Sequence, residues 1–298
     1  MSAFSTDWLA MREPFDRAAR AGSAAQFDWP ALARALRRGR ADDAPVAVLD
    51  LACGTGANLR ELAPRLGGAQ RWLLVDHDRA LLAAVPAALA AWADGQGLRL
   101  KVDGARLHVR GEGSFHIDVE CRCADIALAQ GTLPVAESHL VTCSALLDLV
   151  ATPWLEALVG RCHAAGAALL CALSVDGRIE WQPPDAQDDA MHALFAVHQQ
   201  RDKGFGPALG GEAPRRAAAL LAAAGYRVTR AASDWALDAA RSLADAALLR
   251  ALIEGMAAAA AEQQPAMSSS VGVWQARRLA ALSGTRLRVG HQDLLALP

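Results

Sequence analysis

The sequence predicts an α/β protein built on one doubly wound, mostly parallel sheet. Two observations support this fold class. Short apolar runs of buried-strand type alternate with segments of helical periodicity, which is typical of parallel strands joined by crossover helices. The first of these runs, residues 46–51, is followed by a glycine turn, Cys53-Gly54-Thr55-Gly56, and then by a helical segment. For a chain of 298 residues, we expect one enlarged domain rather than two.

The expected elements follow one another with short connections. Two helices, 8–21 and 29–38, precede the first strand. The core then continues through helix 57–66, strand 71–75, helix 79–93, strands 98–109 and 115–123 joined by a hairpin turn at 111–114, strand 139–143, helix 153–163 and strand 167–173. Beyond Ser174 we expect helices at 186–200 and 214–224, a strand at 226–231, two alanine-rich helices and a last strand at 285–289. The chain is thereby divided into an N-terminal helical cap (1–44), a core (45–175) with an inserted β-hairpin, and C-terminal helical additions (176–298) that complete the same domain.

Composition and charge restrict the class of protein. The formal net charge is -2, and the basic clusters are short, which argues against a nucleic-acid partner. No run reaches the roughly 18 consecutive apolar residues of a membrane span, and the N-terminal segment lacks the pattern of a signal peptide. We therefore expect a cytoplasmic protein without a membrane partner. The Cys121-Arg122-Cys123 pair is a weak metal signal without a second pair, so no metal site is expected.

Three aspartates accompany the glycine turn. Asp50 ends the first strand, Asp76 ends the second strand 26 positions later, and Asp125 follows the strand after that. Ligands of doubly wound sheets bind outside the carboxyl ends of the strands, where glycine lets the backbone approach closely. A carboxylate at the end of the second strand can accept both hydroxyls of a ribose. The turn and these acids therefore predict a nucleoside-binding site.

Simpler roles remain open for the same side chains. Asp50 could only cap the turn, and Asp76 could only be an acid at a helix N-terminus; Asp78 is the better candidate for the helix cap. A nicotinamide or flavin enzyme is a rival with the same fold class. Its fingerprint requires a third glycine three residues after the second, and that position is Leu59.

In these motifs the chain resembles the class I S-adenosylmethionine-dependent methyltransferases, over roughly residues 45–175. Asp50, Gly54 and Gly56 match the first motif of that family, and Ala52 stands where the family often has its first glycine. The resemblance implies a methyltransferase with S-adenosylmethionine as its cofactor and S-adenosylhomocysteine as the product. It also implies that the segment after the fifth strand is a substrate lid.

The resemblance also implies roles for individual residues. Asp50 would orient the turn and the methionine amino group, Asp76 would hold the ribose hydroxyls, and Asp125 with Ile126 would contact adenine. Arg12, on the N-terminal helix, would bind the methionine carboxylate. The complete expected set of cofactor contacts is Arg12, Asp50, Ala52, Gly54, Gly56, Asn58, Asp76, His77, Asp125, Ile126, Cys143 and Ser144.

Methyl transfer from a sulfonium requires mainly that a nucleophile be positioned and water excluded, and a base only where the nucleophile carries a proton of high pKa. Two catalytic candidates are Asp148, just after the fourth strand, and His198, at the start of a polar, glycine-containing loop. A helix-start cap and a solvated helix end are their alternative roles. The expected substrate contacts are Trp181, Asp202 and Lys203, with Trp235 as a further pocket residue.

The acceptor molecule is less well defined by the sequence. The additions to the core include no recognisable RNA-binding module, so we expect a small-molecule substrate and an oxygen, sulfur, nitrogen or carbon acceptor. The segment Cys143-Ser144-Ala145-Leu146 stands where many amino-group methylating enzymes carry an Asn/Asp-Pro-Pro-aromatic motif, which favours an acceptor other than nitrogen. A protein or RNA substrate and a non-catalytic cofactor-binding protein are the alternatives. A monomer or a homodimer is expected.

Overall fold

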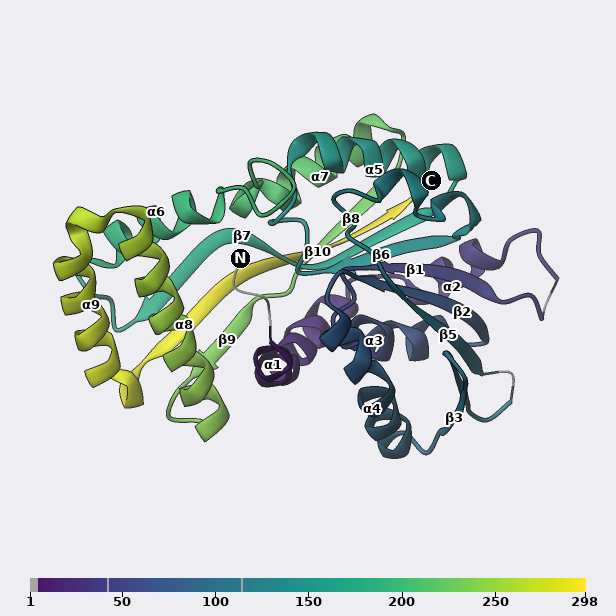
Figure 1. The fold of residues 1–298 in the computed structure, drawn as a ribbon, viewed down its shortest axis with the longest axis horizontal. Helices are drawn as coiled ribbons and strands as arrows, with labels where there is room; N and C mark the ends of the chain where they lie inside the picture. Colours follow the sequence, from purple (N-terminus) through teal and green to yellow (C-terminus); the bar gives the residue numbers. More distant parts are fainter. Residues whose placement is uncertain (1–4, 42, 114) are drawn as a thin grey trace.

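The computed structural model describes residues 5–41, 43–113 and 115–298, which form one central sheet with helices on both faces (Figure 1). The strands of the described chain are β1 (Val46–Leu51), β2 (Ala69–Asp76), β3 (Arg99–Asp103), β4 (Arg106–Arg110), β5 (His116–Cys123), β6 (Leu140–Ser144), β7 (Ala168–Gln182), β8 (Arg227–Ala232), β9 (Trp235–Asp238) and β10 (Arg286–Leu297). Its α-helices are α1 (Thr6–Ala24), α2 (Trp29–Arg37), α3 (Ala57–Leu66), α4 (Arg79–Gly95), α5 (Thr152–Ala165), α6 (Asp188–Gln199), α7 (Ala213–Ala223), α8 (Leu243–Gln263) and α9 (Ser268–Ala280).

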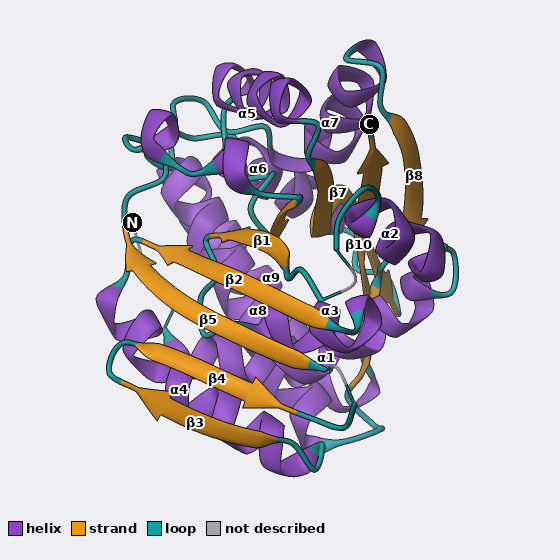
Figure 2. Cartoon of the chain, turned by 90° about the vertical axis from the view of Figure 1, so that its right-hand side faces the viewer, coloured by secondary structure: helices purple, strands orange, loops and turns teal. Residues whose placement is uncertain are grey.

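The strand order is β3-β4-β5-β2-β1-β6-β7-β10-β8, with β9 paired to β10. Strands β5, β2, β1, β6 and β7 are parallel to one another in this order, whereas β4 is antiparallel to β3 and β5, and β10 is antiparallel to β7 and β8. Figure 2 shows the half of the sheet that runs from β1 outward to β3. The chain leaves β1 toward β2 and later returns to its other side with β6, so the strand order switches at β1. The predicted doubly wound, mostly parallel sheet is confirmed.

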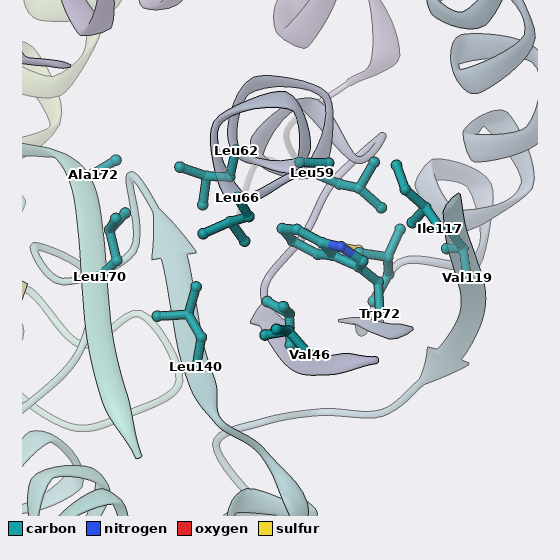
Figure 3. Close-up of a cluster of buried hydrophobic side chains, with 14 of the residues drawn as sticks. Val46, Leu59, Leu62, Leu66, Trp72, Ile117, Val119, Leu140, Leu170 and Ala172 are labelled. Atoms are coloured by element: carbon teal, nitrogen blue, oxygen red, sulfur yellow. The ribbon is translucent and has the colours of Figure 1, made fainter. Parts of the chain in front are cut away.

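The central strands are buried on both faces because helices cover both. All six residues of β1 are buried, as expected for a strand in the middle of a parallel sheet. On one face, α2, α3 and α4 pack on the sheet around Trp72, whose indole lies among the leucines of α3 and side chains of β1, β5 and β6 (Figure 3). The Trp72 Nε1–H donates to Oε1 of Gln70 at 2.8 Å, so this buried polar group is paired. Helices α5 and α7 cover the opposite face.

A third apolar cluster lies where β7 and β10 extend beyond the parallel strands. These two long strands, with β9, carry α6, α8 and α9 on the left of Figure 1. Trp181 and Trp274 meet edge to face in this cluster, with ring centroids 6.2 Å apart. Nearby, the guanidinium of Arg278 pairs with the buried carboxylate of Asp188. The extension adds a wall of helices beside the carboxyl edge of the sheet.

Several sequence-based boundaries need correction. The prediction of a single strand over 98–109 is wrong, because Gly104 has a φ of 59° and the chain turns there between β3 and β4. Strands β4 and β5 pair antiparallel on either side of the predicted hairpin turn, of which Ser114 lies outside the described residues. Strand β9 was not predicted, and β10 continues to Leu297, beyond the predicted end of the last strand at Val289.

Candidate functional site

Two adjoining cavities lie at the carboxyl edge of the parallel strands. The smaller, of about 320 Å³, lies over the glycine turn, and the larger, of about 590 Å³, lies between the sheet extension and α6 and α8. Four residues line both cavities: Arg12, Ala145, Leu149 and Lys203. Because the switch of strand order at β1 opens a crevice there, this is where ligands of doubly wound sheets bind.

The glycine turn forms the floor of the smaller cavity. Gly54 has a φ of 55°, which an L side chain rarely adopts, and its N–H donates to Oδ2 of Asp76 at 2.8 Å. A Cβ at Gly54 would lie 3.0 Å from Cδ1 of Leu9 on α1. Helix α1 therefore covers the turn closely, and the turn itself is tied to the end of β2.

A buried polar network stands behind the turn. Asn58 donates from Nδ2 to Oδ1 of Asp50 at 2.9 Å and to Oγ1 of Thr142 at 3.0 Å, and it accepts from Arg20. Burial raises the pKa of Asp50 to about 7, although the Asn58 hydrogen bond and the Arg20 charge oppose the rise. Oδ2 of Asp50 is buried and has no hydrogen-bond partner among the described residues. Since Asp50 is also a wall residue of the smaller cavity, a buried carboxylate oxygen that lacks a partner among the described residues lies beside this cavity.

The other two predicted acids also line the smaller cavity. Asp76 is buried and accepts from the N–H of Gly54 through Oδ2 and from the N–H of Asp78 through Oδ1 at 2.9 Å. Each carboxylate oxygen has two lone pairs, so further acceptor capacity remains. Asp125 is exposed and accepts from the N–H of Ala127, while the adjoining Ile126 side chain is buried. The exposed ring of His77 completes this side of the cavity.

Apolar and aromatic side chains dominate the larger cavity, and two titratable groups stand in its wall. Oδ1 of Asp148 is buried with no hydrogen-bond partner among the described residues. Burial raises the pKa of Asp148 to about 6, with the Arg12 charge acting against it. His198 also lines this cavity, and its Nε2 lies 3.2 Å from Oε2 of Glu262. Asp148 therefore keeps one acceptor oxygen without a partner in the described chain, whereas His198 is held by the exposed Glu262.

Arg12 stands at the junction of the two cavities and is held on both sides. Its Nε donates to Oδ2 of Asp16 at 2.9 Å, and its guanidinium lies 5.2 Å from the ring centroid of Trp235. The indole N–H of Trp235 donates to Oδ1 of Asp16 at 2.9 Å. This closed set of contacts fixes α1 against β9, so that Arg12 separates one cavity from the other.

Four predicted site residues do not line either cavity: Gly56, Cys143, Trp181 and Asp202. Gly56 is the N-cap of α3, and Cys143 is buried within β6. Trp181 packs in the third cluster and donates to Nε2 of His192 at 2.8 Å. Asp202 accepts from the N–H groups of Gly204 and Gly206 and so shapes the loop that presents Lys203 to both cavities.

Further residues named in the sequence analysis lie in the walls of the two cavities. Ala52, Asn58 and Ser144 line the smaller cavity, and Trp235 lines the larger one. Two residues at the cavities were not predicted as site residues: Leu9, which covers the turn, and His291, which lines the larger cavity. His291 lies two residues beyond the predicted end of the last strand, so no pattern pointed to it.

Two negative findings concern the part of the chain that the structure describes. It holds no group of three or more His, Cys, Asp or Glu side chains placed to bind a metal ion. None of its helices has the length and apolar character needed to cross a membrane.

No family model and no curated protein sequence matches this chain. Solved structures similar to it include a cyclopropane-fatty-acyl-phospholipid synthase-like protein from Lactobacillus casei, at 15% identity and a TM-score of 0.48, covering 98% of this chain and 93% of that one. A SAM-dependent methyltransferase from Thiobacillus denitrificans, in complex with S-adenosyl-L-homocysteine, is 14% identical at a TM-score of 0.39, covering 91% of this chain and 90% of that one. An O-methyltransferase family protein from Burkholderia thailandensis is 15% identical at a TM-score of 0.41; the match covers 97% of this chain but only 61% of that longer one. Similarities of this degree leave the reaction to be inferred from the side chains of the two cavities.

Proposed function

We propose that this protein is an S-adenosylmethionine-dependent methyltransferase of the class I type that acts on a small molecule. The observation that carries the proposal is the meeting of two cavities at the point where the strand order switches. The smaller is built from a glycine turn and three acids at or just after strand ends. The larger is mainly apolar and is lined by Asp148, whose buried Oδ1 has no hydrogen-bond partner within the described part of the chain. We further propose a cytoplasmic protein that is a monomer or a homodimer and has no nucleic-acid partner.

The residues of the smaller cavity fit S-adenosylmethionine. Oδ2 of Asp50, which has no partner among the described residues, suits the ammonium group of its methionine part, because a positive charge stabilises a buried carboxylate. Asp76 retains acceptor capacity for the two ribose hydroxyls, and Asp125 with Ile126 offers an acceptor beside an apolar surface for adenine. When bound, the cofactor supplies a methyl group on a positively charged sulfur.

The larger cavity fits the acceptor substrate. Its volume of about 590 Å³ lies in the range of small-molecule sites, and its apolar walls exclude water from the nucleophile. Asp148 stands close to the junction, since Ala145 and Leu149 on the same segment line both cavities. With a pKa of about 6, its carboxylate is mainly ionised at pH 7 and can take the proton from a hydroxyl nucleophile.

Calorimetry and a transfer assay test the proposal. Titration with S-adenosylmethionine and S-adenosylhomocysteine should give binding at micromolar concentrations, whereas NAD should not bind. Incubation with a methyl-labelled cofactor and a fractionated metabolite extract should transfer label to a small molecule. No binding of either sulfur compound at millimolar concentration would refute the assignment. Binding without label transfer to any small-molecule, protein or RNA fraction would point to a non-catalytic binding protein.

A further inference from the structure

His291 occupies a special place in the wall of the larger cavity. The side chain, in β10, is only 3% exposed, yet it lines this cavity. Next to it the pairing of β10 with β7 is irregular: Val289 pairs with Ile179 and His291 with Val175, so three residues of β7 lie opposite the single Gly290. A Cβ at Gly290 would overlap Oδ1 of Asp176, so only glycine fits there. Such bulges redirect side chains and are enriched beside active sites.

The orientation of His291 is fixed by its backbone and its ring. Its N–H donates to Oδ1 of Asp234 at 3.1 Å, and its carbonyl accepts the N–H of Ser233 at 2.9 Å. Its Nδ1 lies 3.0 Å from the carbonyl oxygen of Val289. The imidazole also lies beside the indole of Trp235, with ring centroids 4.9 Å apart. These contacts hold the ring in one position before any ligand binds.

The same contacts decide where the imidazole proton resides. A carbonyl oxygen can only accept, so Nδ1 of His291 carries a hydrogen and donates it to Val289. Burial, together with the Arg12 charge, lowers the pKa of His291 to about 4, against the opposing effect of Asp176 and Asp234. Both acids are paired with Arg178, at 2.6 and 2.8 Å. The ring is therefore neutral at pH 7, and its Nε2 is a hydrogen-bond acceptor.

We propose that Nε2 of His291 anchors the methyl-acceptor substrate through a hydroxyl group, an inference that rests on the proposed function. The substrate is then a flat, mainly apolar molecule of bicyclic size. The size follows from the sheet. Asp148 follows β6, and His291 lies on β10, two strands away across β7. Neighbouring strands are about 4.8 Å apart, so β6 and β10 are separated by roughly 10 Å, and we take this as the span that the substrate bridges. Aromatic side chains of Trp8, Phe195 and Trp235 line the space between the sheet and the helices.

A matched pair of probes tests this anchor without the cofactor. Naphthalene-2,6-diol has a hydroxyl at each end, and 6-methoxy-2-naphthol has one hydroxyl replaced by an ether that cannot donate. We expect calorimetry of the wild-type protein to show about tenfold tighter binding of the diol, the upper range for one hydrogen bond. In His291→Phe this preference should fall to about twofold, the statistical factor for two equivalent ends. His163→Phe is the matched control, because exposed His163 lines neither cavity and should leave the tenfold preference unchanged.

A measurement on the wild-type protein covers the case in which His291→Phe does not fold. In long-range proton–nitrogen spectra, the Nε2 signal of one Nδ1-protonated histidine should shift with the diol and stay in place with 2,6-dimethoxynaphthalene. His291→Gln, which keeps an acceptor, assigns that signal by its loss. No preference for the diol in the wild type, an unchanged preference in His291→Phe, or no shifted histidine signal overturns the anchor. Diol binding by this pattern without affinity for S-adenosylmethionine would instead refute the proposed function alone.

Discussion

The backbone N–H of Gly54 donates to Oδ2 of Asp76 at 2.8 Å, and this hydrogen bond joins the turn after β1 to the end of β2. The carboxylate therefore does two things at once. It holds the turn in its left-handed conformation, and it presents its remaining lone pairs to the smaller cavity. A ligand that binds Asp76 thus meets a turn already held in place.

Asp76→Ala should weaken the binding of S-adenosylhomocysteine by at least about tenfold, because a hydrogen bond to a charged group contributes more than a neutral one. Calorimetry gives the dissociation constant, and thermal unfolding checks that the variant is folded. Asp103→Ala is the control, since this exposed acid belongs to the β3–β4 hairpin away from both cavities. Unchanged affinity in a folded Asp76→Ala protein would contradict the role of Asp76 at the ribose.

Gly54→Ala and Gly104→Ala form a pair that separates backbone strain from contact with α1. Both glycines have a similar positive φ, 55° and 59°, so each substitution should cost about 1 kcal/mol of stability. Only at Gly54 does the new methyl group meet a neighbour, Cδ1 of Leu9 at 3.0 Å. We expect only Gly54→Ala to lose cofactor affinity, by about tenfold or more. Equal affinities in the two variants would show that α1 does not cover the turn in solution.

Asp148→Asn should lower kcat by about 100-fold or more if the nucleophile is a hydroxyl, because the proton acceptor is lost. A base must be deprotonated to act, so the wild-type rate should rise with pH through about 6, the pKa to which burial raises Asp148. This rise of the rate with pH should disappear in Asp148→Asn and should persist in the matched variant His198→Gln. If the rise instead persists in Asp148→Asn and disappears in His198→Gln, the base is His198.

Asp50→Asn should change how stability depends on pH. Burial raises the folded-state pKa of Asp50 to about 7, above the ordinary value of 3.8. The folded state therefore binds more protons than the unfolded state between about pH 4 and 7. The free energy of unfolding of the wild type accordingly falls as the pH rises through that window, by up to about 1.4 kcal/mol per pH unit. The free energy of unfolding of Asp50→Asn minus that of the wild type should grow from pH 4 to 7 and level off above 7. Urea unfolding of the apo proteins gives both values, and a flat difference would exclude a raised pKa.

The sequence was most informative where local rules decide the structure. Residues 57–66 carry helical periodicity and follow a glycine turn, and α3 has these bounds. The acids Asp50, Asp76 and Asp125 could be placed at one edge because parallel strands end together there, and all three line the smaller cavity.

Contacts between distant segments could not be predicted in this way. Trp181 and Trp235 are both tryptophans on strands, but only Trp235 lines the larger cavity, because packing among β7, β10 and α9 buries Trp181 elsewhere. The position of His291 depends on a bulge in which Gly290 meets Asp176, more than a hundred positions earlier in the chain. Periodicity along one strand contains no information about such an irregularity.

The four residues shared by the two cavities have a thermodynamic consequence. Arg12, Ala145, Leu149 and Lys203 form part of the wall of each, so ligands in the two cavities would share these contact residues. Any free energy with which the first ligand helps or hinders the second must then appear equally when the order of addition is reversed. Measuring the affinity of one ligand with and without the other therefore gives the whole coupling between the two cavities, whichever ligand is added first.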